Sequence, residues 1–185
     1  MSVTLKHIQM TLDPESIENA ILEIENFEMH LKPAMLELIR QLAEKGVEVA
    51  RAELVFFDDP AYRTGALSES VQYKLNSDNA VLTAGEGLET EYGSYAMFVE
   101  YGTGIVGASA PHPEANGYDY DVNSHGAHGW YYPAPWGWVE AEDGTKLAWT
   151  QGMPSRPFMY NTMRDLEVEA KVAGGRIIAE YIAGC

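Results

Sequence analysis

Two stretches in which apolar residues recur at helical spacing lie near the two ends of this 185-residue chain. They predict a helix over residues 14–56 and a second helix that begins near Ser155 or Arg156. Short alternating segments and many glycines separate them, which is typical of strands and turns. This order predicts an α+β fold, in which an antiparallel β-sheet packs against a long N-terminal helix and a C-terminal helix. The two apolar stripes consist of Ile17, Ile21, Ile24, Phe27, Leu31, Met35, Leu38, Ile39, Leu42 and Val49, and of Met159, Met163, Leu166, Ala170, Ala173, Ile177 and Tyr181.

Local signals refine both helices. Asp13 followed by Pro14 is a typical helix start, with the aspartate as the cap and the proline in the first turn. Pro33 removes a backbone donor and is expected to kink or interrupt the first helix, leaving one kinked helix or two in near continuity. Gly174 and Gly175 weaken the last helix, where they permit either close packing on a neighbour or a bend.

The middle of the chain is expected to form one sheet and two long loops. Asp143-Gly144 supplies the positive φ angles of a tight hairpin turn. Residues 58–70 are interpreted as a loop with a short turn at Gly65. Residues 108–135 have no regular period and are interpreted as a long loop, a kind of segment that is uncommon unless it is functional or disordered. The predicted strands are residues 71–76, 80–85 and 95–101 and the hairpin 136–149.

The charge balance excludes some functions. Asp and Glu outnumber Lys and Arg by 28 to 12, which gives a net charge of −16. Sequence-specific nucleic-acid binding needs a cationic surface, so we expect none. The acidity has two interpretations, solubility or the wall of a pore that repels DNA. No apolar run is long enough to cross a membrane, and the N-terminal residues lack a signal-peptide pattern, so we expect synthesis in the cytoplasm and no membrane partner. One cysteine, Cys185, allows no internal disulfide.

Three motifs occur in a fixed order: Thr64–Val71 (TGALSESV), Tyr95–Thr103 (YAMFVEYGT) and Pro154–Phe158 (PSRPF). With the flanking helices, they resemble the head–tail joining and tail-completion proteins of long-tailed phages. The resemblance covers about residues 14–107 and 152–183. Residues 108–151 depart from the shorter family pattern and are interpreted as an insertion into a single domain of residues 1–185.

The resemblance implies a structural role in the virion, at the neck or in the tail, with assembly in the host cytoplasm and no catalysis. Its expected partners are copies of itself in a ring and the portal, head-completion or tail-tube proteins. A ring requires heterologous contacts that close. Sheet edges and the insertion are the candidate contact surfaces, and we expect no cofactor, metal or catalytic residue.

Aromatic residues gather in the insertion and its hairpin, where they fit three roles: a small local core, a subunit contact or a stacking surface for sugar. The third role would make the chain an accessory carbohydrate-binding module of a phage tail. Arg156 occupies the N-terminal end of a helix, which is unfavourable for a cation, so it is expected either to grip a carboxylate or to point into solvent. The candidate interface residues are Tyr101, Trp130, Tyr131, Tyr132, Trp136, Trp138, Arg156 and Phe158.

Histidines and aspartates of the insertion offer a further alternative, a metal-dependent hydrolase. Imidazole and carboxylate groups are suitable metal ligands, but the spacing matches no metal motif, which favours the interpretation of these residues as hydrogen-bonding loop residues. No serine is accompanied by a base and an oxyanion site. The metal candidates are His112, His125, His128, Asp119 and Asp121.

Overall fold

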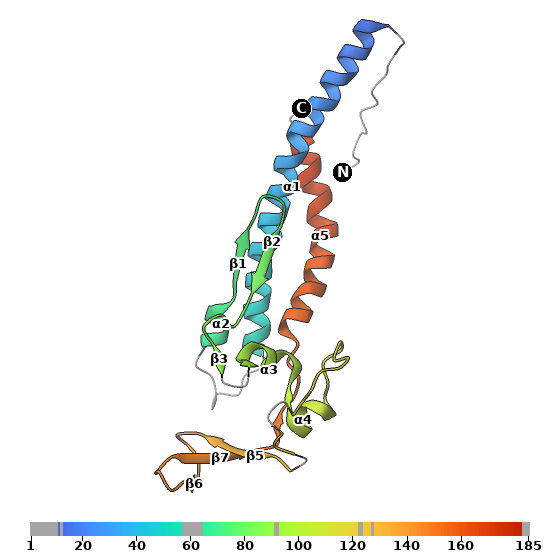
Figure 1. Cartoon of the computed structure of the whole chain (residues 1–185). Coiled ribbons are helices and arrows are strands. Elements are labelled where there is room, and N and C mark those ends of the chain that lie inside the picture. Colours follow the sequence, from blue (N-terminus) through green and yellow to red (C-terminus); the bar gives the residue numbers. More distant parts are fainter. Residues whose placement is uncertain are drawn as a thin grey trace. The chain divides into compact units, whose positions relative to one another are not determined.

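The computed structural model describes residues 11, 13–56, 65–90, 93–121, 124–126 and 128–182. It is a mixed helix and sheet fold with a long N-terminal helix, small antiparallel sheets and a C-terminal helix (Figure 1). The elements are α1 (Pro14–Phe56), α2 (Ala66–Ser70), β1 (Gln72–Leu75), β2 (Ala80–Thr83), β3 (Glu89–Thr90), β4 (Gly93–Ser94), α3 (Tyr95–Tyr101), α4 (Gly104–Ser109), β5 (Trp130–Pro133), β6 (Val139–Glu140), β7 (Lys146–Thr150), β8 (Gly152–Met153) and α5 (Phe158–Ile182).

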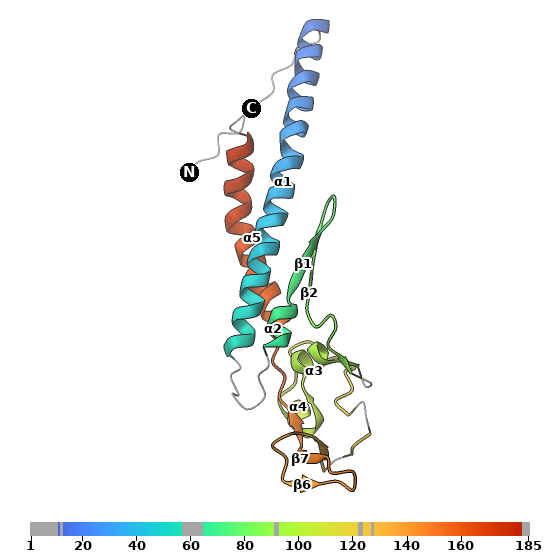
Figure 2. The same cartoon turned by 90° about the vertical axis from the view of Figure 1, so that its left-hand side faces the viewer.

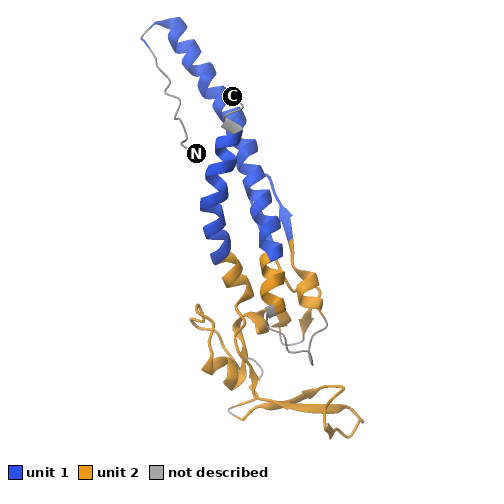
Figure 3. Cartoon of the chain, turned by 180° about the vertical axis from the view of Figure 1, so that it is seen from behind, with its two compact units in different colours: residues 1–48, 73–82, 164–185 blue, residues 49–72, 83–163 orange. Residues whose placement is uncertain are grey.

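The chain divides into two compact units (Figure 3). Unit 1 comprises residues 1–48, 73–82 and 164–185, and unit 2 comprises residues 49–72 and 83–163. Helices α1 and α5 each contribute residues to both units, because the divisions at Glu48 and Arg164 fall within them. That the whole chain is one domain stays a prediction.

Helix α1 begins as the sequence predicts. An oxygen of the Asp13 carboxylate accepts a hydrogen bond from the Ser16 backbone N–H at 2.9 Å, and the Asp13 carbonyl accepts one from Ile17 N–H at 3.1 Å. This carboxylate cap satisfies backbone donors that the first helical turn leaves without helical partners. The helix continues without interruption through Pro33, so the expectation of a single helix is confirmed over that of two.

In unit 1, α1 and α5 run side by side and antiparallel (Figures 1 and 2). A methyl group added at Gly46 would lie 3.1 Å from Leu166, and one added at Gly174 would lie 3.4 Å from Leu38. The step from Leu38 to Gly46 along α1 is matched by the step from Gly174 to Leu166 along α5, which is eight residues in each helix, as antiparallel packing requires. The missing side chain at Gly46 lets the helices approach closely, whereas a methyl group at Gly174 would make only an ordinary contact, so the close-packing alternative for Gly174 and Gly175 stays a prediction.

The same register explains which part of α1 is covered. Counted from Leu38 opposite Gly174, the last residue of α5, Ile182, lies level with His30. The first four turns of α1 extend beyond that point, as both views show (Figures 1 and 2). The prediction that the whole stripe from Ile17 onward packs against the sheet is therefore wrong. The exposed side chains of this segment, which keep 37% to 65% of their surface, are Ile17, Ile21, Leu22, Ile24, Phe27 and Met29.

A hairpin of β1 and β2 completes unit 1, and its turn is closed by a hydrogen bond from Asn76 N–H to the Asn79 carbonyl at 2.8 Å. Leu82 of β2 approaches to 3.3 Å of the methyl position at Gly46. This contact shows that the strand pair packs against α1, at the position where α1 meets Leu166 of α5. The two predicted strands are confirmed, with slightly shorter bounds.

Unit 2 has its own core. Phe158 and Val71 are fully buried, and Leu54, Leu67 and Val99 are also buried. Part of the predicted loop 58–70 is instead the short helix α2, which follows Gly65 in a left-handed conformation with φ of 77°. The rest of that predicted loop lies outside the described residues.

The prediction of a strand over residues 95–101 is wrong, because this segment is helix α3. Its buried residues are Ala96, Val99 and Glu100, three and four positions apart, which is the spacing of a helical face. The five consecutive apolar residues from Tyr95 to Val99 do not distinguish a strand from a helix by periodicity.

The prediction of a single sheet is also wrong, because the strands form three separate small sheets. The sheet of the insertion has the order β5-β7-β6 and is antiparallel. Strand β5 and helix α4 fall partly or wholly within the predicted loop 108–135, which is therefore shorter than expected. The hairpin around Asp143-Gly144 is confirmed. Its loop has three residues, Glu142 to Gly144, and Gly144 takes the left-handed conformation with φ of 81°.

Candidate functional site

Two of the sequence motifs meet at the buried carboxylate of Glu100, near the end of α3. Its oxygen Oε2 accepts a hydrogen bond from Met159 N–H at 2.9 Å, and Oε1 accepts one from Tyr160 N–H at 3.0 Å. These two N–H groups belong to the first turn of α5, whose first helical bond is accepted by the Pro157 carbonyl. Glu100 therefore caps a helix that begins almost sixty residues later, and its charge is favourable at the positive end of the helix dipole.

His112 adds a third donor to this carboxylate. Nδ1 of His112 accepts a hydrogen bond from Glu114 N–H at 2.9 Å, so its proton lies on Nε2. Nε2 lies 3.1 Å from Oε1 of Glu100 and donates to it. The His112 ring is buried between Tyr101 and Tyr160, with ring centroids 4.4 Å and 5.3 Å away. The buried charge thus has three donors, as a buried carboxylate requires.

Backbone contacts join the same two motifs. Ser155 Oγ donates to the Glu100 carbonyl at 2.7 Å, and Arg156 N–H donates to the Val99 carbonyl at 2.9 Å. Antiparallel bridges pair Thr103 with Met153 and Gly104 with Gly152. We call this set of contacts between residues 99–104 and 152–160 the motif joint.

Gly102 makes the motif joint possible. Its φ is 83°, and a methyl group there would lie 2.6 Å from Ser155 N and 2.8 Å from the Met153 carbonyl oxygen. A glycine is therefore required both for the left-handed conformation and for the close approach of the two backbones.

The candidate interface residues fall into separate places. Phe158 has no exposed surface and belongs to the core of unit 2. Tyr101 is half-buried and stacks on Tyr118, with ring centroids 4.6 Å apart. Burial, with weaker effects of Tyr120 and Asp119, raises the pKa of the Tyr118 hydroxyl. Arg156 is half-buried, and its carboxylate partner stays a prediction.

The remaining candidates lie on or beside the β5-β7-β6 sheet. Tyr131 faces Trp149 across the strand pair, with ring centroids 5.1 Å apart, and both side chains are exposed, by 51% and 40%. Trp136 and Trp138, in the segment before β6, are exposed by 50% and 73%. We call these four exposed side chains the aromatic face, a name that refers to their exposure and not to a common side of the sheet. Trp130 and Tyr132, which alternate with Tyr131 along β5, are half-buried.

The metal candidates do not converge in the described part of the chain, where no group of three or more His, Cys, Asp or Glu side chains has a metal-binding arrangement. His112 is engaged with Glu100, and His125 stacks on Trp130 with ring centroids 4.5 Å apart. The Asp121 carboxylate accepts hydrogen bonds from His125 N–H at 2.7 Å and Gly126 N–H at 2.8 Å. These contacts agree with the interpretation of hydrogen-bonding loop residues.

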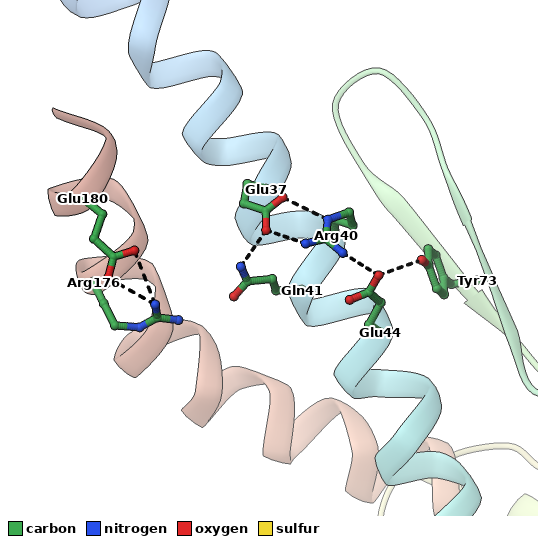
Figure 4. Close-up of polar contacts among 7 residues, drawn as sticks. All are labelled: Glu37, Arg40, Gln41, Glu44, Tyr73, Arg176 and Glu180. Carbon is green, nitrogen blue, oxygen red and sulfur yellow. Dashed lines mark hydrogen bonds and ion pairs between the residues drawn. The ribbon is translucent and has the colours of Figure 1, made fainter. Parts of the chain in front are cut away.

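Unit 1 carries a charge network on α1 (Figure 4). Arg40 forms hydrogen bonds to both oxygens of Glu37, at 2.9 Å and 2.5 Å, and to Glu44 at 2.6 Å. The Arg40 guanidinium, and then the Gln41 amide, lower the pKa of Glu37 to about 2. Tyr73 of β1 reaches Glu44 at 3.4 Å and so ties the hairpin to this network.

The sequence analysis did not predict that Glu100, His112 and Gly102 lie together in one site. The available signal was a single acidic residue inside an apolar run, followed directly by a glycine. Because the partners of Glu100 are mainly backbone N–H groups, no side-chain motif marks the other half of the contact.

No protein-family model matches the chain, and no curated protein or solved structure is significantly similar to it. Within the described ranges, no helix combines the length and the apolar composition needed to cross a membrane.

Proposed function

We propose that the chain is a structural virion protein that joins the head to the tail, or completes the tail tube, of a tailed phage. In this role it forms a ring of copies bound to a portal-side, head-completion or tail-tube protein. It acts by assembly and catalyses no reaction.

The observation that carries the proposal is the motif joint. The motifs that gave the family resemblance, YAMFVEYGT and PSRPF, lie fifty residues apart in the sequence and interlock through Glu100, Gly102 and Ser155. Each of these residues has a mechanical role, which is to cap a helix, to let two backbones approach or to link them. Such roles support a resemblance based on architecture, and they favour a structural protein.

Uncovered apolar surface supports an assembling subunit. The first turns of α1 present six partly exposed apolar side chains, and unit 2 presents the aromatic face. Burying an exposed side chain of the α1 types contributes ~1.5–3 kcal/mol, so covering all six roughly half-exposed ones contributes about 4.5–9 kcal/mol. Association costs ~4–15 kcal/mol, so one such contact gives weak binding, and a closed ring or a virion partner supplies the rest.

Size-exclusion chromatography with light scattering tests the proposal. The chain is measured alone and together with any portal-side and tail-tube proteins that the same genome encodes. We expect a monomer or weak oligomer alone and a stable complex with one of these partners. Failure to associate with either protein, at any concentration or salt tested, would contradict the proposed function.

A second candidate function rests on the aromatic face. Exposed tryptophans beside a strand pair are suited to stacking on sugar rings, and Trp138 exposes 73% of its surface. A glycan array distinguishes the two candidates, because the structural role predicts no specific glycan. Selective binding that disappears in Trp138→Ala would favour the carbohydrate-binding module.

A further inference from the structure

The N-terminal turns of α1 have a chemistry of their own. Beyond the level of His30, where α5 ends, sixteen residues of α1 remain, which is about 24 Å of helix. Ile17, Ile21 and Ile24 continue, at spacings of four and three, the same seam that faces α5 farther along. Glu18 and Glu25 follow two of these isoleucines directly and are exposed along one margin of the seam. The segment is thus an apolar strip with an acidic border, in which the isoleucines are exposed and the small Ala20 between them is buried.

Another surface of unit 1 has the complementary chemistry. Val168 and Val172 lie on one side of α5 and expose 63% and 69% of their surface. Arg164 lies four residues before Val168 and Lys171 three after it, so both lie on the same side of the helix, and both are exposed. Arg176 follows Val172 by four residues and forms an ion pair with Glu180 at 3.3 Å (Figure 4).

Two acidic residues near this surface, Asp165 and Glu169, lie toward α1, whereas the exposed Glu167 lies three residues after Arg164 and four before Lys171, on the same side as both cations. Asp165 and Glu169 both raise the pKa of Lys45 on α1, after the larger effect of the hydrogen bond from Lys45 to Glu48. They therefore lie within electrostatic reach of α1 in the same copy. Arg164, Lys171 and Arg176 are three of the twelve Lys and Arg residues in a chain with a net charge of −16.

We propose that the exposed N-terminal turns of α1 dock on the Val168–Val172 side of α5 in a second copy of this chain. The spacing agrees, because Glu18 and Glu25 are seven residues apart and so are Arg164 and Lys171. An isoleucine, Ile21, lies between the two acids, and a valine, Val168, lies between the two cations. Two helices with the same two-turn repeat can therefore align both charge pairs and the apolar strip at once.

The contact joins two different surfaces, so it is heterologous, and repetition generates a ring or a filament. This inference rests on the proposed function and deepens it by naming the surfaces through which copies meet. Symmetric pairing of two α1 segments is less favourable, because it would bring the acidic borders of both copies together.

Charge reversal with rescue tests the contact. The variants are Glu18→Lys/Glu25→Lys, Arg164→Glu/Lys171→Glu and the combination of all four, each in a Cys185→Ser background that prevents intermolecular disulfides. Glu140→Lys/Glu142→Lys, on the insertion hairpin, is the control with a matched charge change at exposed positions. Circular dichroism checks the fold of each variant, and sedimentation equilibrium gives the association constant up to about 1 mM.

We expect the parent chain to self-associate, each double variant to weaken association roughly tenfold, and the combination to restore it to within about threefold. The control is expected to match the parent. A parent that stays monomeric up to about 1 mM, or a combination as weak as the double variants, would overturn the proposal. Stronger association of Glu18→Lys/Glu25→Lys with no effect of Arg164→Glu/Lys171→Glu would also overturn it, in favour of symmetric α1 pairing.

The outcome is separable from that of the proposed function. If the variants refute the α1–α5 contact and the chain still binds a portal-side or tail-tube protein, only the inferred contact fails. If the charge swap restores self-association and the chain binds neither protein, the contact stands and the proposed virion role fails.

Discussion

Replacement of Glu100 by glutamine probes the motif joint with little change of shape. The carboxylate accepts three hydrogen bonds, from Met159 N–H, Tyr160 N–H and His112 Nε2–H. A glutamine side chain keeps one acceptor oxygen and replaces the other with an NH₂ group, which is itself a donor. In the better orientation, with the oxygen toward Tyr160 and His112, the Met159 N–H loses its acceptor and meets another donor.

The magnitude follows from these contacts. Leaving a buried donor unpaired costs ~1–3 kcal/mol, and the two remaining hydrogen bonds lose the strengthening by charge, which is ~0.5–1.5 kcal/mol each. We therefore expect Glu100→Gln to lower the free energy of unfolding by about 2–6 kcal/mol, a large part of the stability of a typical domain. Glu114→Gln removes the same charge from an exposed position two residues after His112 and is expected to change it by less than ~0.5 kcal/mol.

Urea denaturation followed by circular dichroism measures the difference between the two variants. Amide hydrogen exchange locates it, because the loss of protection should concentrate in the first turn of α5, at Met159 and Tyr160. Equal stabilities of Glu100→Gln and Glu114→Gln, or unchanged protection of that turn, would show that the carboxylate does not hold the helix start.

Three further predictions use other parts of the chain. Gly102→Ala is expected to destabilise the protein by more than ~2 kcal/mol in urea denaturation, because its methyl group would meet Ser155 N at 2.6 Å. The control Gly87→Ala has a φ of 78° and nothing within 4 Å, so it should cost only ~1 kcal/mol of backbone strain. Equal losses of stability in the two variants would contradict the role of the close approach. The pKa of Glu37 is lowered to about 2, so its contribution to stability is complete above pH ~4.5 and is lost as the pH falls toward 2. Glu37→Gln should therefore lose less stability than the parent chain between these pH values when unfolding is measured as a function of pH. The same loss of stability in both proteins would refute this contribution of Glu37. Asp13→Ala removes the cap of α1 and should reduce hydrogen-exchange protection of the first helical turns by an amount equivalent to ~1 kcal/mol, whereas unchanged protection would mean that the cap contributes nothing.

The helices were predictable from the sequence, because a periodic apolar stripe with a cap at Asp13 describes a long helix without reference to the rest of the chain. Whether residues 95–101 form a strand or a helix was not predictable, because their apolar run fits either. The burial of Ala96, Val99 and Glu100 has the spacing of a helix. Strand β5 was missed because glycines and histidines precede it, and its pairing with β7 is a contact that no local pattern encodes.

The candidate site was predictable only in part. The resemblance drew attention to the two motifs, and the structure brings them together at the motif joint. The role of Glu100 depends on backbone N–H groups almost sixty residues away, which have no sequence signature. The exposure of Ile17 and Ile24 depends on where α5 ends relative to α1, and only the helix register reveals it.

Electron cryomicroscopy of the chain co-expressed with any portal-side and tail-tube proteins that its genome encodes tests most directly whether it is a ring-forming virion subunit. The account predicts a closed ring in which α1 of each copy lies along α5 of the next, stacked on one of those proteins. Images that show the chain only as separate monomers, beside assemblies that are complete without it, would contradict the account.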